Sequence, residues 1–334
     1  MKQVEIIAEI GQAHEGSLGT AHALIDALAK RGVKAAKFQM HIAAEESTLE
    51  DKFRTNFSYE DKTRYDYWRR MEFSFEQWVE LKKHCEEKKL EFLCTPLSLE
   101  AVQRLEKLEI KRWKIGSGDT SNFSLLKTVC ATGKPLLLST GMSSYKEIDK
   151  VVDFLKAFPL ELTLFHCVSR YPNPPELIAL EEIGKLRKKY NVPIGFSDHS
   201  GEIYPCLLAT YLGAVALEVH ITFSKEAFGP DTSSSLDLFQ LEELVRGVKY
   251  VEKMLECDTN KDKTAVELKG QKTLFSRSIV AAQDISEGEI IKEKVLSLKK
   301  PGTGLSEDQL KQVIGKIACR NIRKDELIQL DWLS

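Results

Sequence analysis

Three absences narrow the classes to which this chain of 334 residues can belong. No apolar stretch approaches the roughly 18 residues that a membrane-spanning helix needs. The formal net charge is only −2, from 48 Lys and Arg against 50 Asp and Glu, which gives no electrostatic reason to expect nucleic acid or an anionic membrane as a partner. The first residues, Met1–Ile7, contain an acidic residue too early for a secretory signal.

The cysteines also lack a pattern. There are seven, an odd number, and no Cys-x-x-Cys pair occurs. We interpret them as reduced thiols and expect a cytoplasmic protein. Cys94 and Cys167 end predicted strands, where a site could lie, but small buried hydrophobic residues are the commoner role for such cysteines.

The composition that remains is that of an ordinary globular protein, with 43% hydrophobic and 29% charged residues. Short apolar runs alternate with amphipathic segments over the first 256 residues, which predicts parallel strands covered by helices. The predicted strands are Val4–Ile10, Ala35–Gln39, Glu91–Thr95, Arg112–Ile115, Pro135–Ser139, Leu162–His166, Ile194–Ser197 and Ala216–His220. The predicted helices are Leu18–Arg31, Ser74–Lys89, Leu99–Leu108, Phe123–Ala131, Tyr145–Ala157, Pro175–Lys189, Ile203–Leu212 and Leu238–Leu255.

Eight such units in about 250 residues favour a closed (β/α)₈ TIM barrel, with a doubly wound open sheet as the alternative. We therefore predict a barrel domain over residues 1–257, a polar linker over 258–275 and a small α+β domain over 276–334. A domain of that size has little core of its own, so we expect it to pack on another surface.

Two histidines follow predicted strands seven and eight, in Ser197-Asp198-His199 and Glu218-Val219-His220. Neighbouring parallel strands lie about 5 Å apart, so these imidazoles could share one metal ion, with Glu15 or Asp198 adding a carboxylate. Few ligands and open positions suit a catalytic Mn²⁺-, Mg²⁺- or Zn²⁺-type ion. The alternative is that both histidines are structural.

Polar groups at other strand ends predict an anion site. Lys37 and Lys114 lie near the ends of strands two and four, and Ser117 and Ser139 belong to glycine-containing turns. Glycine lets backbone N–H groups approach an anion, and two lysines at one mouth indicate a multiply charged one. Ordinary turns and snorkelling lysines remain the alternative. His166 either donates to a phosphate or fills the barrel mouth.

A segment after strand two, residues 51–72, is rich in aromatic and basic side chains. Long loops at this end of a barrel often act as lids. The alternative is a loop that packs over its own helix.

Short motifs spread over nearly the whole chain resemble those of the sialic acid synthase family, and the C-terminal Lys300–Gly304 resembles part of the antifreeze-like (SAF) module of these enzymes. The motifs of the barrel region are Glu9–Gly16, Lys37–Gln39, Thr95–Pro96, Lys114–Gly118, Leu138–Met142, His166–Cys167, Tyr171–Pro172, Ser197–His199, Glu218–His220 and Gly229–Asp231.

The resemblance implies a transferase that condenses phosphoenolpyruvate with an open-chain amino sugar and releases phosphate. The enol carbon C3 would attack the sugar aldehyde, water would add at C2, and phosphate would leave through C–O cleavage. The implied phosphoenolpyruvate ligands are Lys37, Thr95 and Ser117 for the carboxylate and Lys114, Ser139 and Ser197 for the phosphate.

The same resemblance implies that His199 and His220 hold the metal, most typically Mn²⁺, with Mg²⁺ or Co²⁺ as alternatives. Glu15, Tyr171 and Asp231 would contact the sugar or a metal-bound water, and Asp119 would be an acid/base near the reacting carbons. It also implies a domain-swapped homodimer, in which the small domain caps the barrel of the partner.

Three positions depart from the family pattern. Asp119 replaces the usual Glu, Ala13 replaces an Asn, and Lys300 replaces the Arg of N-acetylneuraminate synthases. Lysine cannot reproduce the planar fork of arginine, so Arg277 is a second candidate for cationic contact with the sugar. The acceptor therefore stays open between N-acetylmannosamine and a 2,4-diacetamido-6-deoxyhexose.

Two other functions compete with the synthase. One is a metal-dependent barrel lyase or aldolase that does not use phosphoenolpyruvate, against which the Lys37, Lys114 and Ser139 cluster argues. The other is a non-catalytic sugar- or ice-binding protein that works through residues 278–334.

Overall fold

The computed structural model describes residues 3–55, 57–257 and 260–334. Two compact units make up the chain, Met1–Glu256 and Cys257–Ser334, and each is described by itself. Residues 1 and 2 lie outside the described residues. So do residues 258 and 259, with which the predicted linker begins. Among the described residues, no helix combines the length and apolar character needed to cross a membrane.

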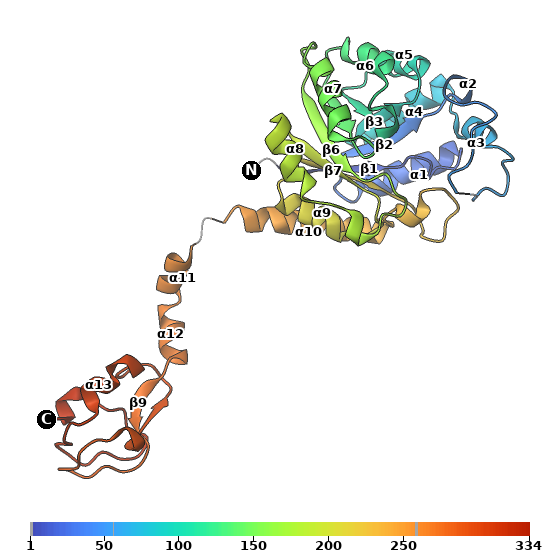
Figure 1. The fold of residues 1–334 in the computed structure, drawn as a ribbon. Coiled ribbons are helices and arrows are strands. Elements are labelled where there is room, and N and C mark those ends of the chain that lie inside the picture. The colour runs from blue at the N-terminus through green and yellow to red at the C-terminus, as the bar shows by residue number, and fades with distance from the viewer. Residues whose placement is uncertain (1–2, 56, 258–259) are drawn as a thin grey trace. The chain divides into compact units, whose positions relative to one another are not determined.

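The first unit is a (β/α)₈ barrel, as predicted (Figure 1). Its strands are hydrogen-bonded in parallel in the order β3-β2-β1-β8-β7-β6-β5-β4. The strands are β1 (Glu5–Glu9), β2 (Ala35–Met40), β3 (Glu91–Pro96), β4 (Trp113–Ile115), β5 (Leu136–Ser139), β6 (Leu162–Cys167), β7 (Ile194–Asp198) and β8 (Ala216–His220).

Strands β3 and β4 lie beside each other and close the barrel without a hydrogen-bonded ladder between them. Arg112 bridges the junction of β3 and β4 at the amino ends of the strands. Its guanidinium donates to Glu91 at 2.8 and 3.0 Å and to Glu5 at 2.8 Å. A bidentate fork of this kind holds two carboxylates in fixed positions, so three strands are joined where backbone pairing stops.

Helices cover the outside of the barrel because their apolar faces pack on the strands. In α7 (Tyr145–Leu155), Ser144 and Glu147 form a capping box, and Ile148 and Leu155 belong to the buried face. The other covering helices are α1 (Leu18–Ala29), α4 (Phe75–Glu87), α5 (Leu99–Lys107), α6 (Phe123–Cys130), α8 (Glu182–Tyr190), α9 (Tyr204–Tyr211) and α10 (Leu238–Leu255).

One predicted helix is wrong in its extent. The segment Pro175–Lys189 contains a short 3₁₀ turn, Pro175–Leu177, and α8 begins only at Glu182. Ala179 between them has φ of 52°, the left-handed region, which ends a right-handed helix. The apolar spacing that favoured one helix therefore spans two elements.

The interior of the barrel has two layers with a period of two along each strand. The lower layer is apolar and fully or almost fully buried, and its members are Ile7, Ala35, Leu93, Leu137, Phe165 and Ala216. Two residues further along the same strands, the upper layer consists of Glu9, Lys37, Thr95, Ser139, Cys167 and Glu218. The apolar layer thus forms the floor on which a polar site is built.

Gly195 makes room for the ring of Phe165 in that floor. A Cβ atom at Gly195 would lie 2.6–2.8 Å from three ring carbons of Phe165, closer than carbon atoms can approach. The ammonium of Lys114 in turn lies 5.3 Å from the centre of the Phe165 ring. The glycine therefore supports a lysine of the site through one aromatic ring.

The segment between β2 and β3 contains two further helices, α2 (Ala43–Glu46) and α3 (Arg64–Met71). Phe57 packs edge-on against Tyr67 of α3 and against Phe228 of the loop after β8, with ring centres 4.9 and 5.4 Å apart. The segment is thus packed across the mouth of the barrel rather than only on its own helix. Residue 56 within it lies outside the described residues.

The second unit begins with two helices, α11 (Lys261–Glu267) and α12 (Lys269–Phe275), within the stretch predicted as a linker. The hairpin of β9 (Ser278–Ala281) and β10 (Leu296–Lys299) follows, with α13 (Leu310–Val313) behind it. A small core holds this unit together, and its members are Ile279, Ala281, Ile285, Ile291, Val295, Val313, Ala318, Ile322 and Ile328.

Candidate active site

A pocket of about 440 Å³, here the inner pocket, lies above the polar layer at the carboxyl ends of the strands. An adjoining outer pocket of about 300 Å³ shares Gln39, Arg54, Tyr171 and His220 with it. The inner pocket is lined by Lys37, Gln39, Arg54, Arg64, Thr95, Leu97, Lys114, Gly116, Ser117, Gly118, Ser139, Met142, Cys167, Ser169, Tyr171, Ser197, His199, Glu218 and His220.

Two lysines and two glutamates form the charged base of the inner pocket, and all four are buried. Lys37 is paired with Glu9 and lies 3.7 Å from Glu218, while Lys114 lies 3.5 Å from the same Glu218 oxygen. The four formal charges cancel. An anion that binds here therefore meets two ammonium groups that carboxylates already hold in place.

Burial and the neighbouring charges shift the pKa values of this base in opposite directions. Burial works against the ammonium of Lys37, but the carboxylates of Glu218 and Glu9 outweigh it and raise its pKa. Burial lowers the pKa of Lys114, with Glu218 acting in the opposite direction. Burial also opposes ionisation of Glu218, but Lys114 and Lys37 prevail and hold the pKa of Glu218 below its usual range.

Hydroxyl groups surround the lysines. Lys114 donates to Ser139 at 2.6 Å, Ser197 donates to Glu218 at 3.2 Å, and Ser117 accepts from the backbone N–H of Gly141 at 2.9 Å. The Thr95 hydroxyl and the second Glu218 carboxylate oxygen are buried without a hydrogen-bond partner among the described residues. Buried polar atoms in this state are where a ligand completes the bonding.

His199 and His220 reach the rim of the same pocket, with ring centres 5.5 Å apart. His199 Nδ1 lies 2.8 Å from the Val168 carbonyl, which accepts its proton, so Nε2 carries the lone pair. The Tyr171 hydroxyl lies 3.1 Å from that Nε2 and donates to it. Burial, with the charge of His220 adding to it, lowers the pKa of His199 to about 4, so the ring is neutral at pH 7.

The two imidazoles fit an open divalent-metal site by the chemistry of their donors. Neutral imidazole nitrogens are ordinary ligands of such ions, and a backbone carbonyl behind the ring fixes the tautomer that ligation requires. Asp231 is the nearest carboxylate, 3.6 Å from His220 Nδ1. Among residues 3–55, 57–257 and 260–334, no cluster of three or more His, Cys, Asp or Glu side chains has ligand spacing, so the protein would leave positions open.

The outer pocket lies between the barrel mouth and the 51–72 segment, and aromatic rings of Phe53, Phe57, Tyr67 and Trp68 line it. Arg54 donates to Asp231 at 2.7 Å, and its guanidinium lies 4.1 Å from the centre of the Tyr171 ring. This arginine thus joins the 51–72 segment to the rim of the histidine pair.

Glu15 stands between that segment and the barrel. Arg70 of α3 donates to the Glu15 carboxylate at 3.1 Å and to its backbone carbonyl at 2.9 Å. Burial raises the pKa of Glu15 to about 7, although Arg70 opposes the shift. Glu15 also has φ of 49°, the left-handed region, where a non-glycine residue is held only by its surroundings. A carboxyl that titrates near neutrality can take up or release a proton there.

Four of the predicted site residues line neither pocket, namely Glu15, Asp119, Arg277 and Lys300. Asp119 is half-buried, accepts a hydrogen bond from Asn122 at 2.9 Å and lines neither pocket. Lys300 and Arg277 belong to the second unit, where Lys300 lies 5.1 Å from the Phe275 ring and Arg277 donates to the Leu298 carbonyl. Asp231 lines the outer pocket but not the inner one.

His166 takes neither of the two roles that the sequence left open, because it lines neither pocket. Its Nε2 lies 2.9 Å from the Ile178 carbonyl, and burial lowers its pKa. The ring faces the helix layer because its neighbours Phe165 and Cys167 occupy the inner face of β6.

Four residues to which the sequence assigned no role belong to the site, namely Glu9, Gln39, Arg54 and Glu218. Gln39 and Glu218 share the inner face of β2 and β8 with the predicted residues Lys37 and His220, each two positions away, and Glu9 lies two positions beyond Ile7 of the floor. Because alternate residues of a strand point to the same face, the sequence alone was enough to predict that these three side chains face the barrel interior. Arg54 carried no such signal, because its position depends on how the 51–72 segment folds.

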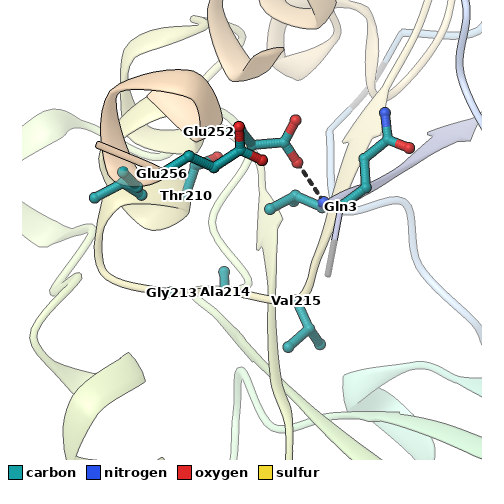
Figure 2. Close-up of a pocket in the computed structure, with 9 residues that line it drawn as sticks. Gln3, Thr210, Gly213, Ala214, Val215, Glu252 and Glu256 are labelled. Carbon is teal, nitrogen blue, oxygen red and sulfur yellow. Dashed lines mark hydrogen bonds between the residues drawn. The ribbon is translucent and has the colours of Figure 1, made fainter. Parts of the chain in front are cut away.

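A pocket of about 420 Å³ lies at the opposite, amino end of the strands, beside α10 (Figure 2). Its described lining includes the carboxylates of Glu252 and Glu256, and Glu252 accepts a hydrogen bond from the backbone N–H of Val4. None of its described lining residues is cationic or an imidazole. The two lysines and two histidines described above lie instead at the carboxyl end of the strands, where barrels of this kind usually have their active sites.

Comparison with known proteins identifies the family of the chain. The model of the NeuB family matches residues 24–260, and the model of the SAF domain matches residues 276–333. The N,N'-diacetyllegionaminic acid synthase of Campylobacter jejuni is 33% identical over 98% of this chain and 100% of its own length. The N-acetylneuraminate-9-phosphate synthase of Homo sapiens is 34% identical over 97% of this chain and 90% of its own.

A solved structure is also similar, the N-acetylneuraminic acid synthetase of Leptospira borgpetersenii in complex with citrate. It is 30% identical, with a TM-score of 0.72, over 82% of this chain and 93% of that one. The relatives share their family but carry names that refer to different nine-carbon acids. The chain therefore belongs to the NeuB family of sialic acid synthases, with a SAF domain after its barrel.

Proposed function

We propose that the protein is a transferase that condenses phosphoenolpyruvate with an open-chain N-acylated amino sugar and water. The products are a nine-carbon 2-keto-3-deoxy sugar acid and phosphate. The observation that carries the proposal is the placement of two buried lysines, several hydroxyls and two imidazoles in one pocket. Few small metabolites carry both a carboxylate and a phosphate for such a pocket, and phosphoenolpyruvate does.

In this proposal the inner pocket binds phosphoenolpyruvate. Lys37, Thr95 and Ser117 bind the carboxylate, and the unpaired Thr95 hydroxyl donates to it. Lys114, Ser139 and Ser197 bind the phosphate, since their polar atoms already converge on one another and on Glu218. Charged hydrogen bonds of this kind each contribute about 1.5–3 kcal/mol.

His199 and His220 hold a divalent ion in this proposal, for which Mn²⁺ is the first candidate. Bound there, the ion supplies Lewis-acid polarisation of the acceptor aldehyde. Burial lowers the pKa of His199 to about 4, which keeps that imidazole neutral at pH 7 and free to bind the ion. When His199 Nε2 binds the ion, the Tyr171 hydroxyl no longer donates to that nitrogen and donates to a substrate oxygen instead.

The remaining groups position the acceptor and move protons. Glu15, with its pKa near 7, holds or releases a proton at the rim. Asp231 and Tyr171 orient the sugar hydroxyls, and the 51–72 segment excludes water from the reacting carbons. Asp119 takes part only if its loop turns toward the pocket that Gly118 already lines.

The outer pocket favours an acceptor without a phosphate group. Both of its arginines already have a carboxylate partner, Arg54 with Asp231 at 2.7 Å and Arg64 with Asp51 at 3.1 Å. Four aromatic rings provide apolar contact for acetamido methyl groups or a deoxy methyl group. N-acetylmannosamine or a 2,4-diacetamido-6-deoxyhexose suits this wall better than a sugar phosphate.

We also propose a cytoplasmic, domain-swapped homodimer, in which the SAF domain of one subunit caps the barrel of its partner. Lys300 and Arg277 then provide cationic contact to the acceptor from the partner. The small core of the second unit supports this proposal, because such a domain gains stability by packing on another surface.

An acceptor panel tests the proposed function. The full chain is incubated with phosphoenolpyruvate, Mn²⁺ and one acceptor at a time, and the products are identified by mass. We expect a nine-carbon acid from an acylated amino sugar and little product from its 6-phosphate. Sugar cleavage that needs no phosphoenolpyruvate would instead indicate a barrel lyase or aldolase.

A further inference from the structure

A chain of hydrogen bonds leads from the charged base of the inner pocket to the wall of the outer pocket. Glu9, the partner of Lys37, accepts from the Gln39 amide at 2.6 Å. Gln39 accepts from Gln12 at 2.8 Å, and the same Gln12 nitrogen lies 3.3 Å from His41 Nε2. His41 Nδ1 lies 2.8 Å from Glu46 at the far end.

The chemistry of the end groups fixes the direction of every bond in this relay, which comprises Glu9, Gln39, Gln12, His41 and Glu46. A carboxylate only accepts, so Gln39 donates to Glu9 and presents its carbonyl oxygen to Gln12. Gln12 must then donate with both N–H groups, to Gln39 and to His41. His41 therefore carries its proton on Nδ1, toward Glu46, and a lone pair on Nε2.

The relay is built as a site and not as a surface contact. Gln12 is 6% and His41 is 3% exposed. The His41 ring stacks on Trp68 of α3 with ring centres 4.1 Å apart and planes 9° apart. Gln12, Gln39, His41 and Trp68 all line the outer pocket, and Gln39 lines the inner pocket as well.

Gln39 is where this relay meets a ligand. One N–H of its amide is held by Glu9, which leaves the second N–H for an oxygen at the junction of the two pockets. An amide can otherwise rotate by half a turn and present its carbonyl instead. The bond from Gln12 to the Gln39 oxygen prevents this rotation.

We propose that Gln12 and His41 are positioning residues that fix the Gln39 amide and thereby control acceptor binding. This inference rests on the proposed function. It predicts a specific division of effects, because Lys37 keeps its contact with Glu9 when the outer part of the relay is broken. The Michaelis constant of the acceptor rises, and that of phosphoenolpyruvate does not.

Two substitutions of His41 separate a relay from a packing role. His41→Phe keeps a ring against Trp68 but removes both hydrogen bonds. His41→Gln loses the ring but places an amide oxygen near the position of Nε2, where it accepts from Gln12. The relay predicts that His41→Phe raises the acceptor Michaelis constant tenfold or more and that His41→Gln restores it to within about threefold. A packing role predicts the reverse order, which would overturn the inference.

Gln12→Glu tests the polarity of the relay. The new carboxylate has no donor for the Gln39 oxygen or for His41 Nε2, so we expect a rise of tenfold or more for the acceptor and less than twofold for phosphoenolpyruvate. Gln77→Glu is the matched control, because Gln77 uses only its oxygen, which accepts from the Ser74 N–H at 2.8 Å. An equal rise in both Michaelis constants for Gln12→Glu would overturn the proposal.

A readout that needs no turnover separates this inference from the proposed function. Nitrogen-15 NMR of the histidines in the full chain should find His41 as the neutral Nδ1–H tautomer. An Nε2–H tautomer would overturn the relay, whatever the kinetics. Absence of acceptor-dependent phosphate release by the unaltered protein would instead contradict the proposed function, and the tautomer would still decide the relay.

Discussion

At the scale of single residues, the site combines charges that would be unstable alone. Lys37 and Lys114 are buried, which lowers the pKa of each ammonium, and the carboxylates of Glu218 and Glu9 act in the opposite direction. The pairing leaves the base of the pocket with no net formal charge. A multiply charged donor therefore needs additional positive charge at the mouth, which the divalent ion proposed for His199 and His220 would supply.

Removal of either proposed metal ligand should abolish turnover. We expect His199→Ala and His220→Ala to lower kcat at least 100-fold and to lose the response to added Mn²⁺, because one imidazole holds a divalent ion poorly. Phosphate release measured against Mn²⁺ concentration checks this. His22→Ala, on the outer helix α1, is the control and should keep full activity. Undiminished activity in either site variant would contradict the metal assignment.

Glu15 makes stability depend on pH with a definite sign. Its folded pKa of about 7 exceeds the ordinary value of 4.5, so the folded chain holds a proton that the unfolded chain has released between these values. Stability therefore falls as pH rises from 4.5 to 7. Glutamine does not titrate, so the free energy of unfolding of the Glu15→Gln variant should fall less than that of the unaltered chain between pH 4.5 and 7. Because the Glu15 side chain is partly exposed, we expect this difference to be about 1–2 kcal/mol.

Chemical denaturation at pH 4.5 and 7.5 measures this difference. The control is Glu60→Gln, because Glu60 lies on the 51–72 segment and also faces Arg70. This substitution should leave the change in the free energy of unfolding between the two pH values as it is in the unaltered chain. A pH dependence in Glu15→Gln equal to that of the unaltered chain would contradict the assignment.

At the scale of elements, the sequence was sufficient for the eight strands because each is a short apolar run between helices, and the structure has all eight. It was insufficient where position depends on contacts remote in sequence. Arg54 reaches the site only because the aromatic rings of the 51–72 segment pack across the barrel mouth. The break at Ala179 was also hidden, because its apolar neighbours keep a helical spacing.

The floor of the barrel gives a prediction for β7. Gly195→Ala should lower the free energy of unfolding by about 1–3 kcal/mol, because its Cβ would lie 2.6 Å from the Phe165 ring. Activity should fall as well, since Lys114 rests on that ring. Denaturant titration measures the loss, and Phe165→Leu in the same chain should recover part of it.

Gly184→Ala is the matched control for this substitution. Gly184 lies within α8 and a Cβ there meets nothing within 4 Å. Alanine should therefore stabilise the helix by about 0.5–1 kcal/mol. Similar effects from both substitutions would contradict the account of the floor.

At the scale of the whole molecule, the proposed domain swap predicts complementation between two inactive chains. One chain carries His199→Ala in its barrel, and the other carries Lys300→Ala and Arg277→Ala in its SAF domain. In a mixed dimer, one barrel with intact histidines is capped by one intact SAF domain. We expect activity to appear on mixing and subunit exchange, at about a quarter to a half of the unaltered level.

As a control, all three substitutions are placed in one chain, here the triple variant. This chain is mixed either with the His199→Ala chain or with the chain that carries Lys300→Ala and Arg277→Ala. Mixing the triple variant with the His199→Ala chain leaves every barrel defective, so activity should stay absent. Activity that never appears in any mixture would contradict a cap supplied by the partner.

The account as a whole depends on phosphoenolpyruvate being the donor, with its phosphate released by cleavage of the bond between carbon and oxygen. Phosphoenolpyruvate labelled with oxygen-18 in the bridging position tests this most directly, with Mn²⁺ and the acceptor that the panel selects. We predict that the label appears in the released phosphate, and only when acceptor and metal are both present. Label retained in the sugar acid, or phosphate released without acceptor, would contradict the account.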